Sequence, residues 1–383
     1  MKIGTDFSGI GSPESALKRL GLDIDEVFAC EIDKFARASF NELHNPTTMY
    51  EDITTRNHSE VPQLDLYVAG FPCQSFSLAG KRGGFEDTRG TLFFNVAEFI
   101  KENQPKCFVL ENVKGLLSHD NGRTYQTITD VLTNGGGTLN GQIGLDSIYN
   151  GLGYHVYAQV LNSKDYGIPQ NRERIFLVGF KEFREFRYPK KMELKLRLKD
   201  LLQDNTESKY FLSDKTINRL STAVRCNGFT DKEKKNISNC IVSGYYRTPT
   251  DGEYIEVDSK YYLSDKMTEG FTLSRNNNTD IVGDLNKGGE RGVVYSEDCS
   301  IMSCLTATDY KQPKQVLVNT NGVKIDKRIR RLTPLECWRL QGYTDEQFNK
   351  AQKVNSDTQL YKQAGNSITV DVMVELFKKI YDI

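Results

Sequence analysis

One cysteine of this chain follows a proline in the segment Gly-Phe-Pro-Cys-Gln-Ser at positions 70–75, directly after an apolar run. Proteins that alternate strands and helices place reactive groups where a strand ends in a loop. The ionised thiolate is a strong nucleophile, although only a few per cent of a free thiol is ionised at pH 7. A single cysteine is more often a buried core residue. Cys73 therefore needs support from other residues before it is interpreted as a nucleophile.

Two further segments carry side chains that could assist such a nucleophile. Glu111 ends an apolar run, and burial at a strand end raises the pKa of a carboxyl group, so that it can hold a proton and donate a hydrogen bond. Arg172 and Arg174 stand in the segment Gln-Asn-Arg-Glu-Arg and could bind a carbonyl oxygen or a carboxylate. A buried pair of Glu111 with an arginine, of purely structural purpose, is the alternative interpretation.

A glycine-rich turn near the N-terminus, Asp-Phe-Ser-Gly-Ile-Gly at positions 6–11, predicts a close approach of backbone to a ligand. A dinucleotide site would need a third glycine near position 14, where the chain has Glu14. We expect that carboxylate to repel a pyrophosphate, which disfavours NAD. Glu31 follows about twenty residues further on, where an acidic side chain can accept both hydroxyls of a ribose.

The first half of the chain alternates apolar strand-like and amphipathic helical segments, which predicts a doubly wound, mostly parallel sheet with right-handed crossovers. We expect strands over Lys2–Phe7, Val27–Glu31, Leu64–Gly70, Cys107–Glu111, Leu152–Leu161 and Ile175–Phe180, and helices over Pro13–Leu20, Lys34–Leu43 and Leu92–Glu102. Residues 134–141 are rich in glycine and predict a surface loop.

Beyond about residue 181 the composition changes. Residues 200–325 are polar, with short strand-like runs such as Ile237–Val242 and Val293–Tyr295. Helical periodicity returns at Leu335–Leu340 and Val370–Tyr381. The chain therefore predicts one large α/β domain that is interrupted by a smaller, β-rich domain.

Taken in order, these segments resemble the motifs of the C5-cytosine DNA methyltransferases, and the resemblance covers nearly the whole chain. The turn at 6–11, the Pro-Cys-Gln at 72–74, the Glu-Asn-Val at 111–113 and the arginine segment at 170–174 match four motifs. Residues 331–337 and 363–367 match the last two. One departure is small: a motif that usually reads Gly-Asp-Ile reads Glu-Asp-Ile at 51–53.

The resemblance implies a class I fold that binds S-adenosyl-L-methionine, with Glu31 on the ribose and Asp52 on the adenine. The residues implied in cofactor binding are Phe7, Ser8, Gly9, Gly11, Glu31, Ile32, Asp52, Ile53, Pro72, Leu92, Asn366, Ser367 and Val370. It also implies a catalytic and cofactor-binding domain over 1–185 and 355–383, and a target-recognition domain over 186–354.

The resemblance further implies that Cys73 adds to C6 of a cytosine that is flipped out of duplex DNA. Glu111 would donate a hydrogen bond to N3, Arg174 would bind O2, and Arg172 would hold the loop or Glu111. The glycine-rich segment 80–90 would close over the base. The residues implied in DNA binding are Gln74, Ser75, Lys81, Arg82, Arg89, Arg328, Arg330 and Arg331.

Composition limits the other classes of function. The net charge of −1 is not that of a typical nucleic-acid protein, but the basic run at 324–331 is dense enough to require an anion. The eight cysteines form no Cys-x-x-Cys pair and the four histidines are scattered, so we expect no metal and reduced thiols. The mean hydropathy is −0.52 and no apolar run is long enough to span a membrane.

We therefore expect a cytoplasmic, nucleoid-associated monomer that acts on double-stranded DNA, either alone or beside a separately encoded restriction endonuclease. Three alternatives remain open: a tRNA cytosine methyltransferase of the same family, a catalytically silent DNA-binding module, and a nicotinamide oxidoreductase. The long polar insert argues against the tRNA methyltransferase, because a tRNA-binding enzyme does not need a domain that contacts bases of a duplex. The joint presence of Cys73, Glu111, Arg172 and Arg174 argues against a silent DNA-binding module. A nicotinamide oxidoreductase would leave Cys73 and Glu111 without a role.

Overall fold

The chain forms two compact units. The computed structural model describes residues 1–72, 92–133, 151–204, 206–210, 281–287, 290–296, 302–303, 315–318 and 328–383, of which 281–331 are described by their backbone. The first unit consists of Met1–Asn162, Glu173–Lys191 and Ile368–Ile383, and the second of Ser163–Arg172 and Met192–Ser367. The predicted functional domains, with boundaries near 185 and 355, stay a prediction.

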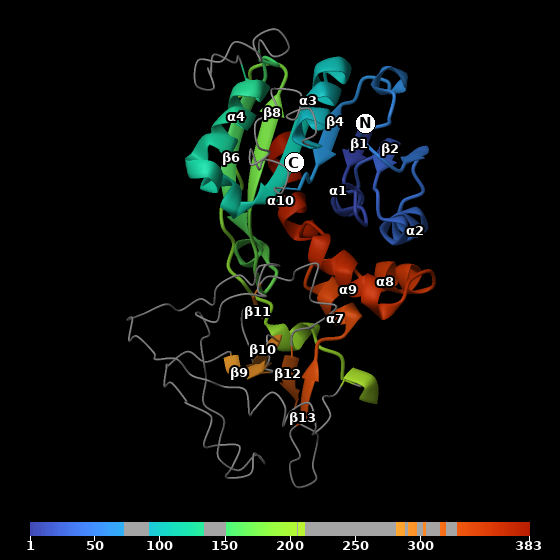
Figure 1. The fold of residues 1–383 in the computed structure, drawn as a ribbon, viewed down its shortest axis with the longest axis vertical. Coiled ribbons are helices and arrows are strands. Elements are labelled where there is room, and N and C mark those ends of the chain that lie inside the picture. Colours follow the sequence, from blue (N-terminus) through green and yellow to red (C-terminus); the bar gives the residue numbers. More distant parts are fainter. Residues whose placement is uncertain are drawn as a thin grey trace, which may run out of the picture. The chain divides into compact units, whose positions relative to one another are not determined.

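The first unit is built on a seven-stranded sheet in the order β3-β2-β1-β4-β5-β8-β6 (Figure 1). Its strands are β1 (Lys2–Asp6), β2 (Asp25–Cys30), β3 (Thr48–Tyr50), β4 (Leu66–Ala69), β5 (Cys107–Val113), β8 (Glu173–Phe180) and β6 (His155–Asn162). The first five of these are parallel, and β8 runs antiparallel to both β5 and β6. The prediction of a doubly wound, mostly parallel sheet is confirmed.

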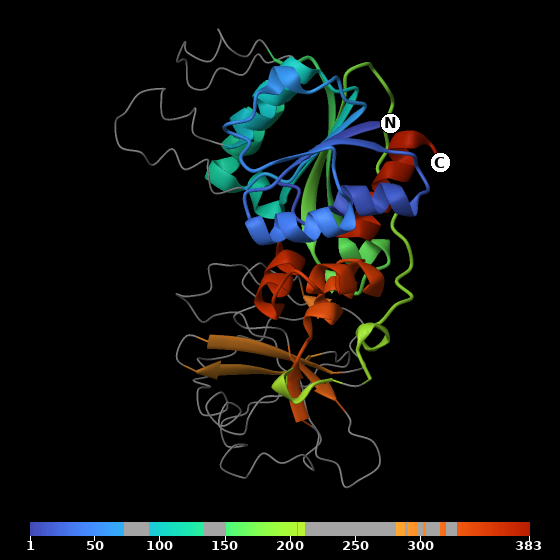
Figure 2. The same ribbon diagram turned by 90° about the vertical axis from the view of Figure 1, so that its right-hand side faces the viewer.

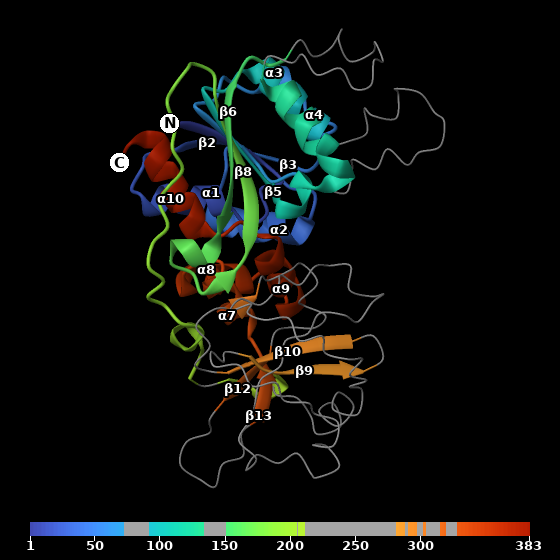
Figure 3. The same ribbon diagram turned by 90° about the vertical axis from the view of Figure 1, so that its left-hand side faces the viewer.

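Helices cover both faces of this sheet. The helices are α1 (Ser12–Arg19), α2 (Lys34–Leu43), α3 (Leu92–Asn103), α4 (Arg123–Leu132) and α10 (Val370–Tyr381). Figures 2 and 3 show α1, α2 and α10 on one face and α3 and α4 on the other. After β1 the chain crosses over to β2, and after β4 it crosses over to β5, which lies in the opposite direction along the sheet. Because right-handed crossovers are the rule, the helices that follow β1 and β4 lie on opposite faces.

This reversal of direction between β1 and β4 matters for function. In open α/β sheets, ligands bind beyond the carboxyl ends of the strands at the point where the order reverses. β1 ends in the glycine turn at residues 7–11, and β4 ends in the segment 70–72 that leads to Cys73. The topology therefore brings the two motifs to the same edge of the sheet.

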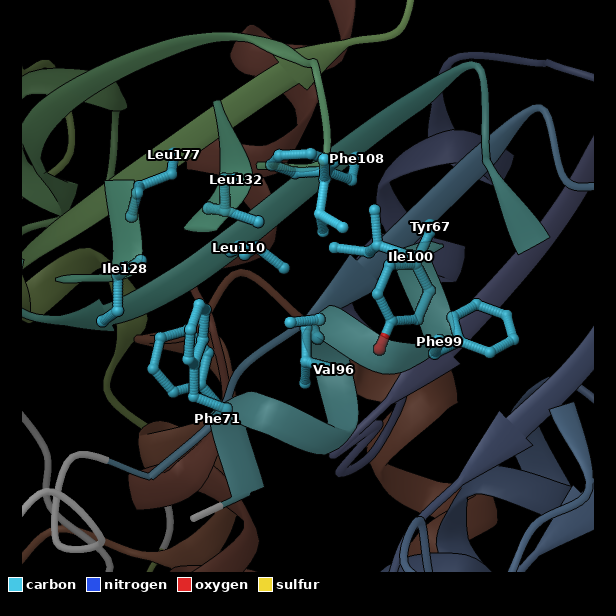
Figure 4. Packing of buried hydrophobic residues seen from close by; sticks show 14 of the residues in the cluster. Tyr67, Phe71, Val96, Phe99, Ile100, Phe108, Leu110, Ile128, Leu132 and Leu177 are labelled. Atoms are coloured by element: carbon cyan, nitrogen blue, oxygen red, sulfur yellow. The ribbon is translucent and has the colours of Figure 1, made fainter. Parts of the chain in front are cut away.

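The core lies between the sheet and the helices α3 and α4. Phe99 and Ile100 of α3 pack against Tyr67 of β4, while Ile128 and Leu132 of α4 lie over β5 and β8 (Figure 4). Residues 107–110 of β5 are buried on both faces, which is typical of a strand inside a parallel sheet. This explains why the strands could be recognised as continuous apolar runs.

The second unit contains shorter elements. A four-stranded sheet has the order β13-β12-β10-β9, and a two-stranded sheet pairs β11 with β7. The strands are β7 (Gln170–Asn171), β9 (Ile281–Lys287), β10 (Glu290–Ser296), β11 (Met302–Ser303), β12 (Gln315–Val318) and β13 (Arg328–Arg331). The helices are α7 (Pro334–Arg339), α8 (Asp345–Gln352) and α9 (Asp357–Asn366), the first two of which begin with capping boxes at Thr333 and Thr344. The predicted run Ile237–Val242 lies outside the described residues.

Candidate active site

The glycine turn after β1 has the backbone that a close ligand approach requires. Phe7, Gly9 and Gly11 all have positive φ, at 54°, 57° and 78°. A Cβ added to Gly9 would meet no atom within 4 Å, so the space beside this residue is open. The buried hydroxyl of Ser8 fixes the turn to β2, because it donates to the carbonyl of Cys30 and accepts from its N–H. The turn is therefore tied to β2, with open space beside Gly9.

Glu31 lies beside this turn, as predicted. Its Oε2 accepts a hydrogen bond of 2.9 Å from the N–H of Gly9, and its Oε1 accepts one of the same length from the N–H of Asp33. Burial raises the pKa of the Glu31 carboxyl above its usual range, although the two backbone donors act in the opposite direction. The carboxylate is held in one orientation and keeps lone pairs that could accept from ribose hydroxyls.

The other predicted cofactor residues of this edge differ in their surroundings. Ile32 is 73% exposed, so a large apolar side chain lies open beside the half-buried Glu31, which fits an apolar ligand surface. Oδ1 of Asp52 accepts from the N–H and hydroxyl of Thr54, and Ile53 is buried in the core. Phe7 and Leu92 are partly buried against the same core.

The interpretation of Glu14 as a charge facing the ligand was wrong. Its side chain is fully buried in α1, and its Oε1 accepts from the hydroxyl of Thr5 at 2.8 Å. Burial raises the pKa of Glu14 to about 7. The residue therefore belongs to the packing between α1 and the sheet, and the charge argument against NAD does not hold.

Sequence reasoning missed a buried ionic network beneath the glycine turn. The guanidinium of Arg56 donates to both oxygens of Asp6, at 2.5 Å and 2.7 Å, and the hydroxyl of Tyr67 donates to Oδ2 of Asp6 at 2.6 Å. The guanidinium also lies 4.3 Å from the ring centre of Phe28 and 4.5 Å from that of Phe99. Asp6 and Arg56 are fifty residues apart, and nothing in their spacing indicates the pair.

The predicted catalytic carboxylate pairs with one of the two predicted arginines. Glu111 is buried at the end of β5, and Nε of Arg174 lies 3.1 Å from its Oε1. A Cβ added to Gly70 would lie 3.6 Å from Oε2 of Glu111. Nδ2 of Asn112 donates to the carbonyl of Phe71 at 2.8 Å, which fixes the segment after β4 to β5. Glu111 therefore lies beside the segment from which Cys73 follows.

Arg172 belongs to the second unit and has different partners. Its Nη2 donates to the carbonyls of Ser367 and Gly365, at 2.7 Å and 3.2 Å. The predicted cofactor residues Asn366 and Ser367 lie in this segment, where Asn366 is exposed and Ser367 is buried. Val370 is buried at the start of α10 in the first unit. Arg172 thus holds the last motif, and its catalytic role stays a prediction.

The remaining predicted residues belong to the segment around Cys73 and to β13. Six of them lie outside the described residues: Cys73, Gln74, Ser75, Lys81, Arg82 and Arg89. The strand β13, which contains Arg328, Arg330 and Arg331, is described only by its backbone. Pro72, the last described residue before Cys73, is exposed. The three cysteines of the described part, Cys30, Cys107 and Cys337, are buried, and burial raises the pKa of the first two thiols far above the usual range. None of these three has the properties of a reactive thiol.

Within the described ranges, no group of three or more His, Cys, Asp or Glu side chains could hold a metal ion. The helices of the described part include none that is both long and apolar enough to cross a membrane.

A family model for the C-5 cytosine-specific DNA methylases matches residues 1–143 and 145–382. The chain belongs to this family. The methylase is 36% identical to the type II methyltransferase M.HpaII of Haemophilus parainfluenzae, over 98% of this chain and 88% of the relative. It is 33% identical to the orphan methyltransferase M.SPRI of Bacillus phage SPR, over 99% and 97% of the two chains.

Solved structures show the same fold. The methylase aligns with the Dnmt2 methyltransferase of S. pombe at a TM-score of 0.61 and 16% identity, over 100% of this chain and 98% of the other. The methyltransferase EhMeth of Entamoeba histolytica gives a TM-score of 0.63 at 14% identity, over 100% and 98%. The predicted family, fold class and enzyme class are confirmed, whereas the roles of individual residues stay predictions.

Proposed function

We propose that this methylase transfers a methyl group from S-adenosylmethionine to C5 of a cytosine flipped out of duplex DNA, through a transient bond between Cys73 and C6. The observation that carries the proposal is the contact of Glu111 with Arg174 beside Gly70, because Cys73 follows Gly70 by three residues. A nucleophile, a carboxyl group and a cation then come from neighbouring strand ends.

The chemistry explains why these residue types are needed. C5 of neutral cytosine is a weak nucleophile, and addition of a thiolate to C6 moves an electron pair onto C5 and N3. Glu111 must take up a proton when cytosine binds; it then donates a hydrogen bond to N3 and so stabilises the charge that develops there. Arg174 binds O2 of the base. Its guanidinium must then contact both Glu111 and the substrate. Loss of the C5 proton to water then expels the Cys73 thiolate.

The edge beyond β1 and β2 fits S-adenosylmethionine, which supplies an electrophilic methyl group when bound. Glu31 would accept the ribose hydroxyls, and the open side of Gly9 would allow close approach of the ligand. The exposed side chain of Ile32 would pack on the adenine ring, and Asp52 would contact its edge. Phe7, Ser8, Gly11, Ile53, Pro72, Leu92 and Val370 of the first unit would complete the lining. Asn366 and Ser367 belong to the second unit, and their part in cofactor binding is proposed from the motif that they match.

Double-stranded DNA is the proposed partner. The relatives named above are type II and orphan methyltransferases, so both a paired restriction endonuclease and a solitary enzyme are compatible with the relatives. We propose that the second unit carries the residues that read the sequence, and that Arg328, Arg330 and Arg331 of β13 contact the phosphates of the same DNA. Gln74 and Ser75 would contact the DNA, and the segment 80–90 would close over the flipped base while Lys81, Arg82 and Arg89 bind phosphates.

Methyl transfer from radiolabelled S-adenosylmethionine to unmethylated genomic DNA and to tRNA tests the proposal. We expect label in duplex DNA only, and bisulfite sequencing of that DNA should show methylated cytosines in one sequence context. Cys107→Ala is the matched control, because it removes a buried thiol from the opposite end of β5. Label in tRNA alone would move the substrate to RNA, and no label in either would refute the activity.

A further inference from the structure

We propose that Arg56 is a positioning residue that holds three cofactor-binding segments in register and thereby sets the affinity for S-adenosylmethionine. The proposal rests on the proposed cofactor. Asp6, Phe28 and Phe99, which Arg56 contacts, are not among the predicted cofactor-binding residues. Its side chain and that of Asp6 are both 0% exposed, so any effect on binding must pass through the segments that the pair connects.

The network reaches the base of each segment. Asp6 is the last residue of β1 and immediately precedes Phe7, whose φ is positive. Phe28, which stacks on the guanidinium, stands three residues before Glu31 in the same strand and its extension. Arg56 closes the loop that carries Asp52 and Ile53. One guanidinium thus connects the glycine turn, the ribose carboxylate and the adenine loop.

The chemistry of the pair favours a positioning role over a stabilising one. Removing two charges from water costs free energy that their attraction only repays when the geometry is good, and apolar residues of similar volume often stabilise a fold as well. A bidentate arginine–carboxylate pair, in contrast, fixes distance and orientation. Burial acts to lower the pKa of Arg56, but the adjacent Asp6 outweighs this effect and keeps the guanidinium charged.

The hydroxyl of Tyr67 makes the geometry more specific. Tyr67 belongs to β4, which pairs with β1, and it donates to Oδ2 of Asp6 from the side opposite β2. Burial and the charge of Asp6 raise the pKa of Tyr67 well above its ordinary value, so the hydroxyl remains a donor. The Asp6 carboxylate therefore has three fixed donors, and the start of the glycine turn cannot rotate independently.

The test compares variants that keep or remove the bidentate geometry. The double variant Asp6→Asn with Arg56→Gln removes both charges together and so leaves no unpaired buried charge, whereas Arg56→Lys keeps the charge but loses the fork. The matched control is Asp65→Asn with Lys106→Gln, which removes an ion pair of 2.7 Å at the amino ends of β4 and β5. Urea midpoints would establish that each variant is folded.

Calorimetric titration with S-adenosylmethionine is the direct readout. We expect Kd to rise about tenfold or more in the double variant, to rise less in Arg56→Lys, and to stay unchanged in the control. KM for the cofactor should rise in parallel, while KM for DNA and kcat at saturation stay within about twofold. A folded double variant with the Kd of the wild type would overturn the proposal. A wild-type protein that does not bind S-adenosylmethionine would instead refute the proposed function.

Discussion

Nε of Arg174 lies 3.1 Å from Oε1 of Glu111, across the antiparallel pair β5–β8. The register places Phe176 opposite Glu111 and Val113 opposite Arg174, so the two charged residues are diagonal neighbours on one face. Both side chains are largely buried, at 11% and 14% exposure. We infer that a base bound near the carboxyl end of β5 could exchange contacts with this carboxyl group and this guanidinium.

Replacement of either member of this pair should slow methyl transfer. We expect Glu111→Ala and Arg174→Ala each to reduce the single-turnover rate by about 10²-fold or more, because both groups stabilise charge in the transition state. The double variant should lose much less than the product of the two effects, since the residues act as a unit. Lys114→Ala is the control, because Lys114, which directly follows β5, forms a more exposed ion pair with Glu173 at the start of β8. Fully additive losses would show that the two residues act independently.

Glu31 should govern cofactor affinity. Glu31→Gln is expected to raise Kd for S-adenosylmethionine about tenfold, because an amide accepts fewer hydrogen bonds from the ribose than a carboxylate. In the wild type, affinity should fall as the pH decreases and Glu31 takes up a proton. Since burial raises the pKa of this carboxyl, the fall should begin above the usual carboxyl range. Asp33→Asn, which preserves the cap of α2, should have little effect on Kd; an equal effect of both variants would argue against a ribose contact.

The buried carboxyls of Glu14 and Glu26 should make the fold less stable at high pH. Burial, with a further contribution from Glu14, raises the pKa of Glu26 to about 9. Such a carboxyl group has a higher pKa in the folded protein than in the unfolded chain. Between these two pKa values it keeps its proton only in the folded state, so the free energy of unfolding falls as the pH rises, by at most about 1.4 kcal/mol per pH unit.

Glu26→Gln should therefore be more stable than the wild type at pH 8, with an advantage that shrinks toward pH 5. Urea unfolding at both pH values measures this difference. Glu42→Gln, on the exposed side of α2, should change stability equally at both. A pH-independent effect of Glu26→Gln would indicate that Glu26 is ionised in the folded protein.

The arginines of β13 should contact DNA phosphates. Replacing one true contact, by Arg328→Gln or Arg330→Gln, should flatten the dependence of log K on log salt by about 0.9 on duplex DNA. Binding should weaken to a similar extent on all sequences, because phosphates carry no base information. Lys353→Gln, an exposed residue at the end of α8, should leave the slope unchanged. An unaltered slope in the β13 variants would assign these arginines to another role.

Much of the first unit could be predicted because its strands are continuous apolar runs between turn residues. The helix Lys34–Leu43 was predicted with its observed bounds, and Val370–Tyr381 likewise. The helix α4 was missed, and so was α8, although its capping box between Thr344 and Gln347 is a readable signal. α8 is short and mostly polar and gives weak periodicity, whereas Thr124, Ile128, Val131 and Leu132 of α4 lie at helical spacing on one buried face, so that α4 also carries a readable pattern.

The candidate site, like the fold, contains residues whose contacts the sequence predicts and others whose contacts it does not. Glu31 beside Gly9 could be predicted, because strand order and a glycine turn together determine which residues meet at one sheet edge. The Arg56–Asp6 pair could not, because a contact between residues fifty positions apart exists only after the sheet has formed. Glu14 was misinterpreted since its position in a turn motif does not reveal that its side chain points into the core.

Covalent trapping on DNA that contains 5-fluorocytosine tests the central claim most directly. Fluorine at C5 cannot leave as a cation, so the bond between protein and C6 persists after methyl transfer. We predict a denaturant-stable complex with the wild type and with Cys107→Ala, formed only when S-adenosylmethionine is present, and none with Cys73→Ser. A complex that still forms with Cys73→Ser, or a crosslinked peptide that lacks Cys73, would contradict the account.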